Sequence, residues 1–138
     1  MSNGAAPLAL TGRCHCGAVS VTIPRPPTEV TNCNCSLCRR VGGLWAYYLC
    51  SEVKITGDPK HTDSYVQGDR TLRTVRCKTC GCVTHWSPLD PTTYPRMGVN
   101  MRMFDPAEAG DFRIRLLDGA DSWQSFDWED LGHEPTKP

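Results

Sequence analysis

Nine cysteines in 138 residues constrain the fold of this chain more than any other feature of its sequence. Seven of them stand in three short groups: Cys14 and Cys16, then Cys33, Cys35 and Cys38, then Cys77 and Cys80. The first ten residues lack the basic segment of a signal peptide, so we expect a cytoplasmic protein, in which a disulfide framework is unusual. Nine is also odd, which makes complete pairing impossible. The groups therefore predict metal binding.

The spacing of the cysteines predicts two zinc sites of different kinds. A C-x-x-C or C-x-C pair places two thiolates where both reach one zinc ion at about 2.3 Å. The first and third groups together offer four ligands (the four-cysteine group), which predicts a closed structural site. The middle group offers three (the three-cysteine group), and a zinc ion with three protein ligands keeps a position for water or substrate, as catalytic zinc does. Two structural sites, or one site with buried free thiols, are the alternatives.

Short alternating runs of apolar and polar residues, separated by Gly and Pro, predict a mainly β fold. One run alternates over 18–23 and stops at Pro24. Further strands of the same kind are expected at 44–49, 52–56, 63–66, 71–75 and 112–116.

Two short helices are the only ones expected, at 36–41 and at 106–109, the second with Asp105 as its N-terminal cap. No linker or repeat divides the chain. We expect one zinc-binding domain at 8–131, with flexible ends at 1–7 and 132–138.

The charge balance excludes some partners. Fifteen Lys and Arg residues face fifteen Asp and Glu residues, so the formal net charge is zero. That balance argues against binding to nucleic acid or to an anionic membrane through a broad basic surface. No apolar run approaches the roughly 18 residues that a membrane-spanning helix needs. We expect a monomer or homodimer that binds neither nucleic acid nor membrane.

Three stretches carry a family resemblance: Gly-Arg-Cys-His-Cys-Gly at 12–17, Asn-Cys-Asn-Cys-Ser-Leu-Cys-Arg-Arg at 32–40, and Arg-Cys-Lys-Thr-Cys-Gly at 76–81. In order, spacing and flanking residues the chain resembles the glutathione-dependent formaldehyde-activating enzymes, a family that includes centromere protein V. The resemblance covers about 8–130. It implies an Mss4-like fold, a β-tent of twisted antiparallel sheets around zinc. It also implies that the four-cysteine group holds a structural zinc ion and the three-cysteine group a catalytic one, so two Zn²⁺ ions per chain.

The activity that this resemblance implies is the condensation of formaldehyde with glutathione to S-hydroxymethylglutathione, a carbon–sulfur lyase reaction. Its expected partners are a small thiol such as glutathione and a small aldehyde, with Cys33, Cys35 and Cys38 as catalytic residues. Arg39 and Arg40 are expected to bind a glutathione carboxylate, because guanidinium groups pair with carboxylates through two parallel hydrogen bonds. The alternative for both arginines is a solvated face.

Two other functions are compatible with the same residues. In the first, both zinc ions are structural and the chain is a non-catalytic binding module. In the second, open thiolate sites exchange metal, and the chain buffers zinc or thiols.

Three further residues are candidates for chemistry. His85 could serve as an acid–base group or as a fourth ligand of the open zinc, although a histidine packed within a strand is commoner. Cys50 and Cys82 fall outside the three groups, and buried free thiols are the default interpretation for both.

Overall fold

A computed structural model describes residues 9–127 and shows a mainly β fold of two sheets with few helices. The expected flexible ends, 1–7 and 132–138, lie outside the described residues. The large sheet has eight strands, in the order β12 (Ser125–Asp127), β11 (Arg113–Leu117), β4 (Glu29–Cys33), β5 (Trp45–Leu49), β10 (Arg96–Asn100), β9 (Val83–Pro88), β8 (Leu72–Cys77) and β7 (Thr62–Val66).

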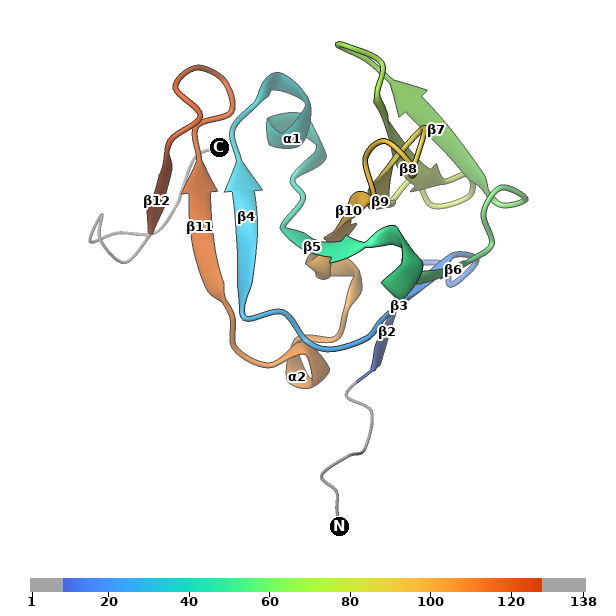
Figure 1. Cartoon of the computed structure of the whole chain (residues 1–138). Coiled ribbons are helices and arrows are strands. Elements are labelled where there is room, and N and C mark those ends of the chain that lie inside the picture. Colours follow the sequence, from blue (N-terminus) through green and yellow to red (C-terminus); the bar gives the residue numbers. More distant parts are fainter. Residues whose placement is uncertain (1–8, 128–138) are drawn as a thin grey trace.

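The large sheet is antiparallel at every pair but one. Strands β4 and β11 run parallel, with Ile114 opposite Val30 and Leu117 opposite Cys33. Figure 1 shows β4 and β11 rising on one side and β7 to β9 on the other, with β5 and β10 between them. Because the carboxyl ends of β4 and β11 meet at the same edge, the loops that follow them lie next to each other. One of those loops carries the three-cysteine group.

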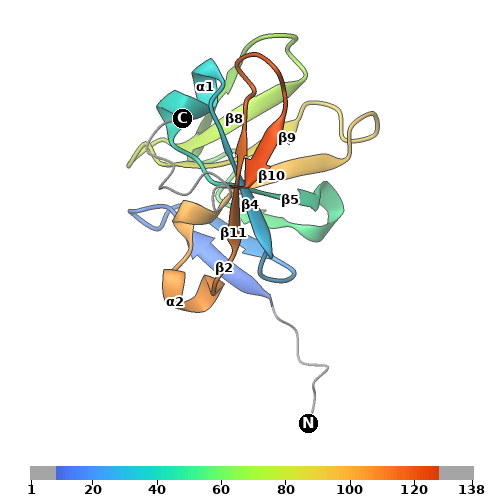
Figure 2. The ribbon, with the colours of Figure 1, turned by 90° about the vertical axis from the view of Figure 1, so that its left-hand side faces the viewer.

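The small sheet has three antiparallel strands, β2 (Leu10–Arg13), β3 (Ser20–Ile23) and β6 (Lys54–Thr56). Figure 1 labels its three strands at the lower right, and Figure 2 shows β2 in the lower part of the view. Buried side chains of both sheets form one core, among them Val21 and Ile23 from β3, Val30 from β4, and Val99 from β10. The mainly β architecture is thereby confirmed, and it is consistent with the Mss4-like tent.

The helices are short. α1 (Ser36–Val41) and α2 (Pro106–Ala109) have the predicted bounds, and two 3₁₀ turns, η1 (Cys50–Glu52) and η2 (Met101–Met103), follow strands. The side chain of Asp105 caps α2 as expected, by accepting from the Ala107 N–H. α1 is capped by the Cys35 sulfur. Within 9–127, no helix combines the length and the apolar character needed to cross a membrane.

A close contact between β9 and β10 depends on a glycine. Gly98 on β10 lies opposite Trp86 on β9 and opposite Tyr47 on β5. A Cβ atom at Gly98 would collide with Trp86 Nε1. The absence of a side chain therefore lets the indole lie against the β10 backbone, with its ring centroid 6.0 Å from that of Tyr47.

We predict that Gly98→Ala destabilises the protein by about 1–3 kcal/mol, since the added methyl group forces Trp86 out of place. Urea unfolding followed by far-UV circular dichroism gives the free energy of unfolding. The control is Trp86→Leu, alone and combined with Gly98→Ala, because the smaller side chain leaves room for the methyl group. An alanine that costs the same in both backgrounds would show that the indole is not the constraint.

Candidate metal centres

The four-cysteine group brings together two turns that are far apart in the sequence. Cys14 and Cys16 lie in the β2–β3 turn, whereas Cys77 ends β8 and Cys80 follows it. Their sulfur atoms all lie within 4.8 Å of one another, with 3.8 Å between those of Cys14 and Cys16 and 3.5 Å between those of Cys16 and Cys77. In a tetrahedron with metal–sulfur bonds of about 2.3 Å, neighbouring sulfurs are about 3.8 Å apart. The donor set and its spacing therefore fit a metal ion such as zinc.

Backbone N–H groups point at several of these sulfurs and lower the pKa of Cys77 and of Cys80. Val19 N–H donates to Cys14 Sγ at 3.3 Å, and another backbone N–H donates to Cys77 Sγ at 3.3 Å. The N–H of Cys82 is the main cause that lowers the pKa of Cys80 to about 5. Thiolate is the form that binds metal.

The three-cysteine group is local. Cys33 ends β4, Cys35 caps α1 and Cys38 lies in the first turns of that helix. The three sulfurs lie within 4.8 Å of one another. The Cys35 N–H donates to Cys33 Sγ at 3.4 Å and the Cys38 N–H donates to Cys35 Sγ at 3.3 Å. The strand end and the helix start therefore aim three thiols at one point.

Cys33 and Cys38 compete for negative charge. A hydrogen bond from Cys38 is the largest cause that lowers the pKa of Cys33 to about 6, although burial acts in the opposite direction. The same hydrogen bond raises the pKa of Cys38, and burial raises it further. Without a cation, Cys33 is therefore favoured as the thiolate and Cys38 as the thiol that stabilises it. Ionisation of Cys38 as well requires a positive charge nearby, as a metal ion would supply.

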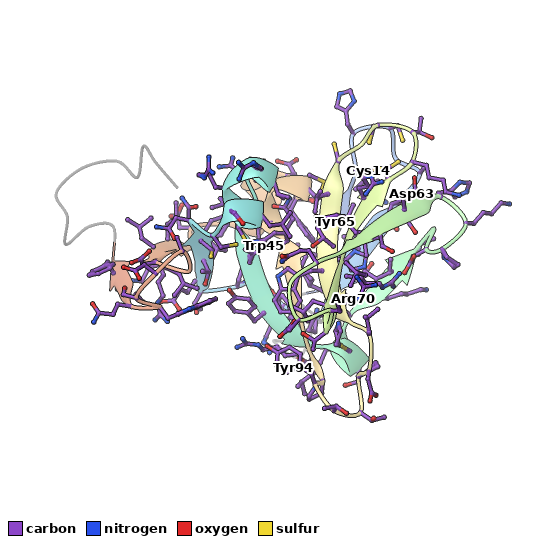
Figure 3. All side chains as sticks on the ribbon, turned by 90° about the horizontal axis from the view of Figure 1, so that it is seen from above. Cys14, Trp45, Asp63, Tyr65, Arg70 and Tyr94 are labelled. Atoms are coloured by element: carbon purple, nitrogen blue, oxygen red, sulfur yellow. The ribbon has the colours of Figure 1, made fainter. Side chains whose placement is uncertain are left out.

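A cavity of about 820 Å³ opens beside the three-cysteine group. All three of its cysteines line the cavity, and none of the four-cysteine group does. Figure 3 shows the molecule from above, with Trp45 near α1. Tyr65 on β7 and Arg70 in the loop after β7 lie on the side that faces α1. The volume lies within the range of small-molecule sites. The three-cysteine group therefore borders this space, in which a substrate could bind, and the four-cysteine group does not.

The loop between β11 and β12 is fixed onto the three-cysteine group. The Asn34 side chain donates to Asp118 Oδ1 at 3.1 Å and accepts from the Ala120 N–H at 3.0 Å. A Cβ atom at Gly119 would come within 2.5 Å of Cys33 Sγ, so only glycine fits there. Neither Asn34 nor Gly119 was predicted as a site residue from the sequence. The position of Asn34 between two cysteines was the one available signal.

The two arginines expected to bind substrate lie on α1 and are exposed. Arg40 donates to the Ser36 carbonyl oxygen at 2.8 Å. Neither Arg39 nor Arg40 lines the cavity, whereas Arg70 and Arg96 do. Substrate binding by Arg39 and Arg40 stays a prediction, and the sequence analysis did not single out the two cavity arginines.

His85 lies away from the cavity. It is 1% exposed, and its Nδ1 is 2.9 Å from the hydroxyl of Thr84. Trp86, the next residue on β9, lines the cavity, and successive side chains of a strand point to opposite faces. This placement favours the packed histidine over the catalytic one.

The two remaining cysteines have different neighbours. Cys50 begins η1 and packs against the main core. Cys82 is partly buried and forms a hydrogen bond with Cys80, one of the four-cysteine group. Both are free thiols.

We predict two zinc ions per purified chain, and different consequences of losing each. The four-cysteine group joins residues 61 positions apart, so its metal-binding energy is folding energy, and Cys14→Ser should leave the chain largely unfolded. Cys35→Ser should lose one zinc ion but change the free energy of unfolding by no more than about 1 kcal/mol. Serine can replace the Cys35 sulfur as the cap of the helix. Because the thiols of this short segment can also bind zinc in the unfolded chain, this zinc ion adds little to the free energy of unfolding. Inductively coupled plasma mass spectrometry and thermal unfolding measure both quantities. One zinc ion per wild-type chain, or equal destabilisation by Cys14→Ser and Cys35→Ser, would contradict the division into a structural and an open site.

We also predict a pH dependence of stability that originates at His85. Burial lowers its pKa to about 4, whereas in the unfolded chain it is about 6.5. Between these values the unfolded state binds the proton and the folded state does not. The free energy of unfolding therefore falls as the pH drops, by about 2 kcal/mol at pH 5.

Urea unfolding at pH 7 and pH 5 tests this, with His85→Gln as the comparison. The variant should lose less stability than the wild type over that interval. Metal release at acid pH affects both proteins and cancels in the difference. Equal losses would assign the pH dependence to other groups.

Comparison with known proteins agrees with the geometry. A family model described as glutathione-dependent formaldehyde-activating enzyme matches residues 9–113. The chain is also similar to the crystal structure of a Rhodobacter sphaeroides protein determined as a structural genomics target, with 28% sequence identity and a TM-score of 0.61 over 76% of this chain and 99% of that one. The resemblance carried by the cysteine motifs is thereby confirmed: the chain belongs to the glutathione-dependent formaldehyde-activating enzyme family.

Proposed function

We propose that the protein is a zinc-dependent carbon–sulfur lyase that forms or cleaves the adduct of a thiol, glutathione, with a small aldehyde. The observation that carries the proposal is the three-cysteine group at the wall of a cavity of about 820 Å³. The four-cysteine group lies outside that cavity, as suits a structural ion. Membership of the family supports the reaction class. Free thiols in such numbers also suit a reducing cytoplasm.

In this proposal the three-cysteine group holds the catalytic zinc ion. Zinc held by three thiolates keeps a coordination position at which it acts as a Lewis acid. The backbone N–H groups of Cys35 and Cys38 fix the positions of two of these sulfurs.

The reaction needs one proton to move. A bond forms between the thiol sulfur and the carbonyl carbon, the thiol loses its proton, and the carbonyl oxygen ends with one. Cleavage of the adduct reverses both changes. A side chain that stays protonated beside the cavity can donate a hydrogen bond to the oxygen as its negative charge develops.

Tyr47 has the properties of that donor. It lines the cavity, and burial raises its pKa, with the negative charges of Cys33 and Cys38 acting in the same direction. A hydrogen bond with Thr31 and the charge of Arg96 act in the opposite direction. The phenol therefore stays protonated at neutral pH. It lies close enough to the three-cysteine group for the charge of that group to affect its pKa.

We expect the wild type, loaded with zinc, to accelerate the exchange between S-hydroxymethylglutathione and its free components. Cys35→Ser should reduce the exchange to the spontaneous rate. Tyr47→Phe should reduce the acceleration about 100-fold with unchanged zinc content, because it removes one hydrogen-bond donor. Two-dimensional exchange NMR at chemical equilibrium measures these rates directly.

The matched control is Cys50→Ala, which removes a thiol outside both metal groups and should leave the exchange rate unchanged. Thiols and formaldehyde combine spontaneously, so each rate is compared with a sample that lacks protein. If the wild type is no faster than Cys35→Ser, the lyase proposal is wrong and a non-catalytic zinc module takes its place.

A further inference from the structure

The exposed apolar side chains of this protein are concentrated around the cavity. Six large hydrophobic residues in 9–127 are exposed, and four of them line it: Tyr65, Leu89, Tyr94 and Trp123. Leu49 and Phe126 are the other two. An apolar surface gathered at one concave site indicates a ligand that covers it. Formaldehyde has a single carbon atom and cannot do so.

Trp123 is the most unusual of these residues. It is 67% exposed, and its φ angle of 61° lies in the left-handed region, which a bulky side chain rarely occupies. The loop holds this backbone in place, since the Trp123 N–H donates to the Asp118 carbonyl oxygen at 2.7 Å and the Ser122 hydroxyl donates to Asp118 Oδ2 at 2.8 Å. Glycine would adopt the same backbone conformation with less conformational strain. Packing within the described residues therefore gives no reason for an indole there.

The indole lies next to the three-cysteine group. A Cβ atom at Gly119 would be 3.5 Å from the Trp123 ring and 2.5 Å from Cys33 Sγ, so one glycine separates the ring from that sulfur. The loop itself is tied to the cysteine segment through Asn34. A group attached to a carbon that reacts beside these sulfurs would therefore meet the face or edge of Trp123.

Another part of the lining also consists of flat side chains. The rings of Trp86 and Tyr94 are stacked with centroids 6.5 Å apart and an interplanar angle of 24°. The ring of Tyr47 lies 6.0 Å from that of Trp86, and the Arg96 guanidinium covers Tyr47 at 4.4 Å. Aromatic surfaces of this kind favour planar partners.

The charged residues that line the cavity can bind the thiol substrate, glutathione, but they do not explain the aromatic surface. Arg70 and Arg96 form no ion pair with a described carboxylate, which leaves two guanidinium groups for the two carboxylates of glutathione. The carboxylates of Asp69 and Asp90 accept hydrogen bonds within their own turns. If these arginines bind the two carboxylates of glutathione, neither glutathione nor formaldehyde has an apolar group that could cover the aromatic surface.

We propose that the aldehyde part of the adduct carries a planar apolar group, as in an aromatic aldehyde, and that Trp123 determines this specificity. The inference rests on the proposed function for its reaction, which is unchanged. The thiol sulfur bonds to the carbonyl carbon, the thiol proton is released, and the oxygen ends protonated. No oxidation or reduction occurs.

The first experiment measures binding without reaction. Isothermal titration calorimetry compares S-benzylglutathione with S-methylglutathione, two stable thioethers, on the zinc-loaded full chain. The benzyl compound should bind at least about 10-fold more tightly, since ring stacking and burial together are worth about 1.4 kcal/mol or more. Trp123→Ala should remove most of that preference, and Trp123→Phe should keep most of it. Phe126→Ala, which removes an exposed ring outside the cavity, should leave it unchanged.

Folding of each variant is checked by circular dichroism and zinc content. If Trp123→Ala fails to fold, Trp123→Gly replaces it, since glycine suits the φ angle of 61°. Equal affinity of the wild type for the two thioethers would overturn the inference. A preference for the benzyl compound that survives removal of the ring would overturn the role of Trp123.

The second experiment separates this inference from the proposed function. Exchange NMR with glutathione compares benzaldehyde with formaldehyde on the wild type and on the Trp123 variant. The ratio of the two accelerations should favour benzaldehyde and fall about 10-fold in the variant. If formaldehyde exchange is accelerated and benzaldehyde exchange is not, the inference fails and the lyase proposal stands. If neither is accelerated while the benzyl preference depends on Trp123, the lyase proposal fails and the class of ligand stands.

Discussion

The clustering of cysteine sulfurs from distant parts of the chain is the constraint on which this structure depends. Cys16 and Cys77 are 61 positions apart, yet their sulfur atoms are 3.5 Å apart. One belongs to the turn between two strands of the small sheet and the other ends a strand of the large sheet. A metal ion held there would link the two sheets directly. The core that lies between them is completed by apolar residues such as Ile23 and Val30.

The local part of this arrangement could be predicted from the sequence, because ligand spacing is a local property. The structure brings together the same four and the same three cysteines that the motifs group. α1 and α2 begin and end where their caps indicate, at Cys35 with Gly42 and at Asp105 with Gly110. The strands of clear alternation also appear, among them β3 and β11.

The long-range part could not be predicted, because it depends on which distant segments meet. The parallel pairing of β4 with β11 places the loop at 118–124 over Cys33, and no local pattern encodes that register. β9 and β10 have a neighbouring strand on each side and lack clear alternation. The role of Gly98 follows only from the indole of Trp86 on the neighbouring strand. His85 shows the same limit, since its distance from the cavity depends on the face of β9 that it occupies.

The two groups of cysteines also show why one ligand type can serve two purposes. In the proposed function, the four-cysteine group stabilises the fold at a distance from the cavity, so the residues that line the cavity are not needed for that stabilisation. Trp123 is exposed on a hairpin loop and Tyr94 on a connection between strands, where neither is needed for the buried core. Substitutions at such positions change the surface offered to a ligand while the sulfur chemistry beside Cys33 stays the same. In the proposed function, the cysteines thus determine the reaction class and the loops determine the substrate, so the sequence motifs indicate the first and not the second.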